Sequence, residues 1–100
     1  GLNSSFFAYY TLQATVSEFY GDYRVKPEAV VSVEFFLTVT NAGKGNPLIG
    51  ANRYTKRIAL KDNTPEALVL GQQQALAEIF KQYEEQLYKY AGNLPKPMGQ

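Results

Sequence analysis

The residues that carry most enzyme and metal chemistry are either missing from this sequence or placed where they cannot act together. The chain has no histidine and no cysteine, which removes the commonest general base, the thiolate nucleophile and the soft metal ligands. Glu84 and Glu85 are adjacent on an expected helix, so they point in different directions. Asp22, Glu28 and Asp62 are expected in turns, with no evident partner. The sequence therefore predicts a protein that is not an enzyme, with no catalytic residues, no cofactor and no metal site.

Basic side chains are the second group with chemistry of interest, because they can bind phosphates. Arg53, Arg57 and Lys61 form a basic surface on one face of an expected strand. Tyr54 belongs to the opposite face, so it cannot stack a nucleic-acid base beside them. The formal net charge is only +1, and Glu34 on the neighbouring strand offsets part of the basic charge. This pattern favours a solvated sheet face over a single-strand nucleic-acid site, with contact to anionic lipid headgroups as the remaining alternative.

A long amphipathic helix is predicted between residues 63 and 92. Thr64 can cap an orphan N–H, Pro65 suits the first helical position, and Glu66 lies where the helix dipole favours negative charge. Apolar residues follow at three- and four-residue spacing: Leu68, Ala75, Leu76, Ile79, Phe80, Tyr83, Leu87 and Tyr90. Gly71 costs ~1 kcal/mol relative to alanine in a helix. Its presence favours a close approach of the helix to the sheet or to a neighbouring chain, with a mild kink as the alternative.

Three strands precede this helix. Apolar and polar residues alternate over residues 10–17, and the phase slips near Phe19, which predicts a bulge or the strand end there. Residues 21–28 are expected to form a loop. Alternation over residues 29–40 predicts the second strand, and residues 48–61 return as the third after a glycine-rich reversal.

The apolar pattern also restricts how the second and third strands pair. Odd positions of the second strand must oppose even positions of the third, or the core face would turn to solvent. A register with Phe35 opposite Tyr54 satisfies this rule. A two-residue shift that places Glu34 opposite Arg57 satisfies it equally, so the pattern leaves both open.

Together these elements predict an α+β fold, an antiparallel three-stranded meander packed under one long C-terminal helix. A fourth strand from a missing segment or a partner would extend the sheet. Residues 1–92 are expected to form a single domain of a larger parent protein, and residues 93–100 a flexible tail.

Five aromatic residues are candidates for partner or lipid contact: Phe6, Phe7, Tyr9, Phe36 and Tyr88. The first three either pack on the core or form an apolar patch that another segment covers. Phe36 interrupts the polar face of the second strand. Tyr88 falls off the apolar stripe of the helix, which predicts partial exposure.

Five motifs follow one another in a particular order: YTLQATVSEF from Tyr10, AVVSVEFFL from Ala29, Arg53-Tyr54-Thr55, DNTPEALV from Asp62 and QALAEI from Gln74. This order resembles the C-terminal half of the auxiliary lipoprotein component of ABC-type lipid transport systems, the PqiC-like family. The resemblance covers roughly residues 6 to 90 and consists of apolar and small residues, with no catalytic signature to transfer.

The resemblance implies a non-enzymatic component of an ABC/MCE-type lipid transport system in Gram-negative bacteria, acting by protein–protein and lipid contact. Such proteins are periplasmic and anchored to the outer membrane by a lipidated cysteine. That cysteine has no counterpart here, so we expect the anchor to belong to the parent protein. The expected partners are envelope protein subunits of the transport complex and phospholipid. The alternatives are an adaptor domain of an envelope or secretion complex with no lipid role and, third, a single-strand nucleic-acid binder.

Overall fold

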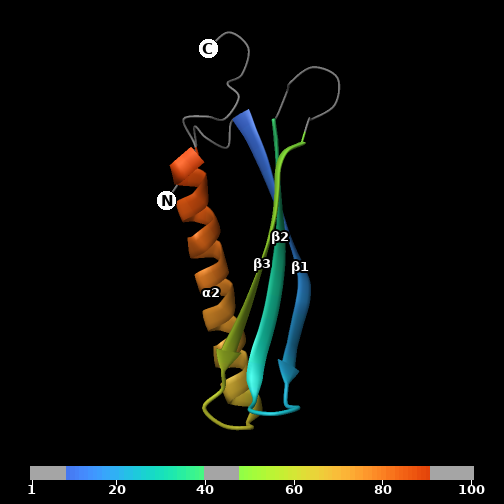
Figure 1. The fold of residues 1–100 in the computed structure, drawn as a ribbon, viewed down its shortest axis with the longest axis vertical. Helices are drawn as coiled ribbons and strands as arrows, with labels where there is room; N and C mark the ends of the chain where they lie inside the picture. Colours follow the sequence, from blue (N-terminus) through green and yellow to red (C-terminus); the bar gives the residue numbers. More distant parts are fainter. Residues whose placement is uncertain (1–8, 40–47, 91–100) are drawn as a thin grey trace.

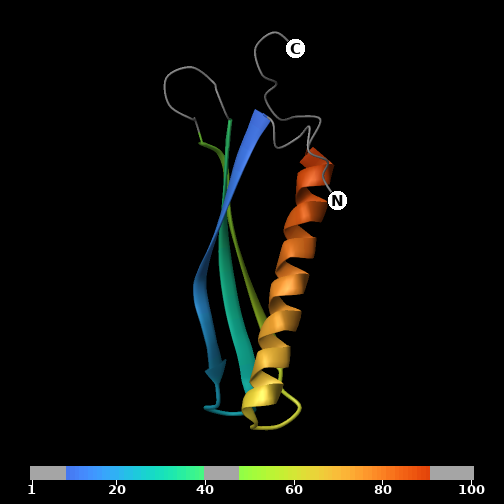
Figure 2. The ribbon, with the colours of Figure 1, turned by 180° about the vertical axis from the view of Figure 1, so that it is seen from behind.

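The computed structural model describes residues 9–39 and 48–90 of the chain. This part forms, in order, β1 (Tyr10–Asp22), β2 (Glu28–Val39), β3 (Leu48–Ala59) and α2 (Pro65–Tyr90). The strands make one antiparallel sheet in the order β1-β2-β3, and α2 lies along one face of it (Figures 1 and 2). The predicted α+β meander under one long helix is confirmed. The expected tail at residues 93–100 lies outside the described residues.

β1 is longer than the sequence predicts, and it contains the predicted bulge. Ser17 is the extra residue, because Val16 pairs with Val33 while Glu18 already pairs with Ser32. The bulge therefore falls two residues before the predicted phase slip. Residues 21 and 22, expected in a loop, continue the strand and pair with residues 29 and 28.

The pairing of β2 with β3 has the predicted parity but neither of the two predicted registers. Tyr54 lies opposite Val33, and Arg53 lies opposite Glu34. Parity survives any two-residue shift, so the apolar pattern cannot choose among these registers. The pairing is also irregular at Ile49: Leu37 pairs with Gly50 and Thr38 with Leu48, so Ile49 is an extra residue on β3. The apolar pattern does not encode this one-residue shift of the register.

The core lies between α2 and the face of β2 that carries its odd-numbered residues. Phe35 is fully buried at its centre. Its ring stacks on Tyr83 at 4.0 Å between centroids and meets Tyr54 and Phe80 edge-on at 5.9 and 5.3 Å. Tyr54 also donates a hydrogen bond to Gln86 and so ties β3 to the helix. Four rings thus join the helix, the central strand and one edge strand.

The helix begins where the sequence predicts. The Thr64 hydroxyl accepts a hydrogen bond from the Ala67 N–H at 3.1 Å, which satisfies one orphan donor of the first turn. Asp62 accepts hydrogen bonds from both the N–H and the hydroxyl of Thr64. These bonds lower the pKa of the Asp62 carboxyl, the side-chain bond most strongly.

α2 packs on the sheet along a seam of buried residues at every fourth position: Ala67, Gly71, Ala75, Ile79, Tyr83 and Leu87. The first three are the smallest residues available and the last three are large. A helix with such a seam must lie close to the sheet at its N-terminal end and further away at its C-terminal end. Figures 1 and 2 show this divergence.

Gly71 marks the closest approach. A Cβ at this position would lie 2.5 Å from Leu60 Cδ2 and 3.0 Å from the Cβ of Ala29 on β2. The prediction that Gly71 permits close packing on the sheet is confirmed.

Candidate contact surface

α2 leaves part of the inner sheet face uncovered at β1. Val16 and Phe19 pair with Val33 and Val31, which belong to the buried core, so their side chains lie on the same face as the helix. Both are nevertheless 49% exposed. The Ser17 bulge puts these two residues, three apart in sequence, on one face of the strand. β1 therefore presents apolar side chains that this part of the chain does not bury.

The flank of α2 that faces β1 continues this apolar surface. Leu68 follows the seam residue at position 67 by one position, and its Cδ1 lies 3.1 Å from where a Cβ on Gly21 of β1 would stand. Residues one position after each seam member lie on the same flank of the helix, about 100° round from the seam. Leu76 and Phe80 occupy such positions, and Phe80 is 45% exposed.

The apolar residues of β1 and of this flank of α2 lie at matching levels, Leu76 half-buried and the other three exposed. Starting from the contact of Gly71 with β2, Phe19 lies two strand residues further along, about 7 Å, and Val16 four residues along, about 14 Å. At ~1.5 Å per helical residue these levels fall near Leu76 and Phe80. We call Val16, Phe19, Leu76 and Phe80 the β1 flank patch.

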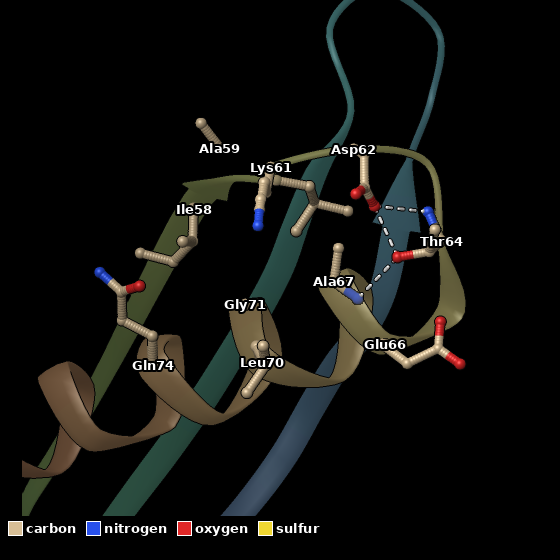
Figure 3. A pocket seen from close by; sticks show the side chains of 11 residues that line it. Ile58, Ala59, Lys61, Asp62, Thr64, Glu66, Ala67, Leu70, Gly71 and Gln74 are labelled. Atoms are coloured by element: carbon tan, nitrogen blue, oxygen red, sulfur yellow. Dashed lines mark hydrogen bonds between the residues drawn. The ribbon is translucent and has the colours of Figure 1, made fainter.

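The opposite flank of α2, which faces β3, forms a hollow with both polar and apolar residues. Gln74 and Leu70 line a hollow of about 290 Å³ with Ile58 of β3, shown in Figure 3. In the same view the Thr64 hydroxyl lies between the Asp62 carboxylate and the Ala67 N–H. Asp62 and Thr64, two of the polar residues at this hollow, thus stabilise the turn and the start of the helix.

The two edges of the described sheet also differ. β3 carries Arg53, Lys56 and Arg57 in its middle, and Lys56 lies half-buried on the helix side, opposite Val31. Inward-pointing charges and lysines on an edge strand discourage pairing with another chain. β1 has no charged residue from Gln13 to Ser17.

The outer face of the sheet carries two ion-pair clusters instead of a free basic stripe. Asp22, only 8% exposed, receives Arg24 Nη2 at 2.7 Å and Arg57 Nη1 at 3.1 Å. Arg57 also contacts Glu28 at 3.1 Å. Hydrogen bonds from the Arg24 side chain and N–H, then from Arg57, hold the pKa of the Asp22 carboxyl far below its usual range. The prediction that Asp22, Glu28 and Asp62 lack partners is wrong, because neighbouring strands and turns bring donors to them.

The second cluster lies further along the same face. Glu18 accepts hydrogen bonds from Ser32 Oγ at 2.6 Å and from Arg53 Nη2 at 3.1 Å. Ser32 is fully buried and also shares a hydrogen bond with Thr55 at 2.7 Å. The Ser32 bond, then Arg53, lowers the pKa of Glu18. Arg53 is therefore paired with Glu18 of β1, and Arg57 with Asp22 of β1 and Glu28 of β2.

The residues singled out from the sequence lie apart from one another. Phe6 and Phe7 lie outside the described residues. Tyr9 packs half-buried against the core. Phe36 is half-buried on the outer face, and Tyr88 is 50% exposed on the helix, as predicted. Lys61 is exposed just after β3. Their contact roles stay predictions.

Sequence reasoning missed the β1 flank patch because its members read as core. Val16 continues an apolar alternation, and Phe80 belongs to the apolar stripe of the helix. The sequence does contain one signal for the patch, which is the small residues that recur at every fourth position of the helix. They determine that α2 packs over β2 and β3, and this leaves the apolar residues of β1 uncovered.

No known protein family, curated protein or solved structure matches the chain. In the part of the chain that the structure describes, no helix has the length and apolar character needed to cross a membrane. The same residues contain no cluster of three or more metal-binding side chains.

Proposed function

We propose that this protein is a non-enzymatic component of a lipid transport system in the Gram-negative envelope, of the PqiC-like auxiliary class, and that it works by binding other envelope proteins. The observation that supports this mode of contact is the β1 flank patch, which lies beside a strand edge with no charged residue from Gln13 to Ser17. Exposed apolar surface next to unpaired strand backbone is typical of a protein-binding site.

The sequence motifs behind the resemblance have consistent structural roles, and this supports the proposal. Tyr54 of the Arg-Tyr-Thr motif links β3 to the helix. Thr64 of the acid-led turn caps α2, and Ala75 of the Ala-Leu-Ala motif lies fully buried in the seam. The residues that the resemblance rests on are those that build the strand pair and dock the helix.

The outer face favours this reading over nucleic-acid binding. Arg53 and Arg57 each pair with acids across the sheet, so less of their charge is available to phosphates. Affinity based on the apolar patch should change little with added salt, whereas single-strand nucleic-acid binding should fall steeply.

The test is metabolic labelling of the full-length gene product with a radioactive fatty acid, followed by membrane fractionation. Acylated protein in the outer-membrane fraction is the expected result. Unlabelled protein in the cytosol would contradict the proposal. Unlabelled periplasmic protein that co-purifies with envelope subunits would favour the alternative, an adaptor domain with no lipid role.

A further inference from the structure

We propose that the partner binds by adding a β-strand beside residues 13–22 of β1, on the side away from β2, and that this strand is an extended segment of another polypeptide with apolar side chains at alternate positions. The proposal rests on the contact mode of the proposed function and specifies its geometry.

The backbone of β1 supplies the first argument. β1 pairs with β2 on one side only, and no described strand lies on its other side. In an antiparallel sheet, alternate residues of such an edge strand direct their N–H and C=O groups away from the sheet. Between Gln13 and Ser17 no charged side chain or proline obstructs a neighbour.

The helix supplies the second argument. A strand added about 4.8 Å beyond β1 would place its inward side chains beside Val16 and Phe19, within reach of Phe80. Those positions must be apolar to exclude water from the β1 flank patch. Its outward side chains would lie next to Thr15 and Glu18 on the polar face, so the added strand must alternate apolar with polar residues.

β3 is the poorer edge. Lys56 lies on its helix side, so an apolar strand added there would bury an ammonium group without a partner. The helix is also tied to this edge strand by the bond between Tyr54 and Gln86.

The bulge makes a different polypeptide a better occupant than a second copy of this chain. Ser17 lies near the middle of β1. A two-fold pair of β1 strands centred there would place one bulge against the other and break the ladder where the contact should be strongest. A regular strand from another protein meets only one bulge.

Amide hydrogen exchange of the full chain, followed by NMR, tests the proposal. The probe is a designed nine-residue peptide of alternating valine and threonine with a lysine at each end, added at millimolar concentration. A new backbone hydrogen bond to the peptide contributes a free energy that corresponds to up to about a tenfold slower exchange of the amide that donates it. We therefore expect alternate amides between residues 13 and 22 to exchange up to about tenfold more slowly, while β3 amides are unchanged.

A matched pair of variants makes the test specific. Val16→Lys places a charge in the β1 flank patch and should abolish the protection. Val25→Lys makes the same change at a loop residue that is 90% exposed, and should leave it intact. Circular dichroism of both variants checks that they fold. Protection along β3, no protection of β1, or equal protection in Val16→Lys would overturn the proposal.

Sedimentation of the chain without peptide tests the choice of occupant. A concentration-dependent dimer that Val16→Lys dissociates would overturn it in favour of a second copy. If the peptide gives no protection but the full-length protein is labelled with fatty acid, only strand addition is ruled out. If the peptide protects β1 but the protein is not labelled, the lipid transport role is ruled out and strand addition is retained.

Discussion

Gly71 offers the sharpest test of how α2 packs on the sheet. Gly71→Ala adds one methyl group at the point where the helix and the sheet are closest. That methyl carbon would lie 2.5 Å from Leu60 Cδ2 and 3.0 Å from the Ala29 Cβ, both shorter than ordinary van der Waals contact.

Two effects of this substitution oppose each other. Alanine in a helix interior is favoured over glycine by ~1 kcal/mol. Overpacking a filled site costs about 1–3 kcal/mol. Leu60 can relieve its contact by rotating the end of its side chain, but Ala29 is fully buried and its Cβ is fixed to the backbone of the central strand. The helix must therefore lift from β2, and we expect a net loss of about 1 kcal/mol in the free energy of unfolding.

Urea unfolding followed by circular dichroism measures this loss. Ala77→Gly, at an exposed helix position, is the control that gives the propensity effect in this helix. In an Ala29→Gly background the obstructing methyl group is gone, so Gly71→Ala should become stabilising by about 1 kcal/mol. The sign change between the two backgrounds is the signature of steric contact between these residues.

A single result would refute the reasoning. If Gly71→Ala stabilises the unaltered chain by as much as Ala77→Gly destabilises it, then the helix does not contact β2 at Gly71. The small residues of the seam would then have no bearing on how the helix lies.

Three further predictions concern the core, the acid response and the helix start. Phe35→Ala removes the ring that stacks on Tyr83 and should cost about 3–5 kcal/mol in urea unfolding, with a much smaller loss for Phe35→Leu. The Asp22 carboxyl has a lower pKa in the folded chain than the unfolded value of about 3.9, so its stabilisation is complete above that value and is lost as the pH falls toward the folded pKa. Thermal unfolding from pH 7 to pH 2.5 should therefore show a smaller acid-induced loss in Asp22→Asn, and an unchanged slope would contradict the ion-pair account. Thr64→Ala removes the helix cap and should cost about 1 kcal/mol, and Thr64→Ser should restore most of it; equal losses in the two variants would argue against the cap.

The sequence predicts the elements well because local rules decide them. The cap at Thr64, the alternation of β2 and the apolar period of the helix each need only neighbours within a few residues. Parity between β2 and β3 also follows, since burial of one face requires it. The register does not follow, because it depends on the connection between the strands and on the irregularity at Ile49.

The contact surface was harder to predict for a related reason. An apolar residue such as Val16 reads as core whether or not a helix covers it, and the sequence does not say over which strands the helix lies. The sequence also does not indicate the second partner of Asp22, because Arg57 is 35 residues away and is brought near only by the strand pairing.

The seam of α2 also determines the angle between the helix and the sheet, because the helix can pivot about its closest contact. Its fulcrum is Gly71, where glycine allows the tightest contact, and Ile79 and Leu87 stand at distances of about 12 and about 24 Å along the axis. A change in side-chain size that raises the helix by about 1 Å at Ile79 would displace the Leu87 end by about 2 Å while the fulcrum stays in place. The angle between helix and sheet is thus encoded in side-chain volume, and one substitution far from the fulcrum can alter how far the C-terminal half of the helix stands from the sheet without disturbing its docked N-terminal end.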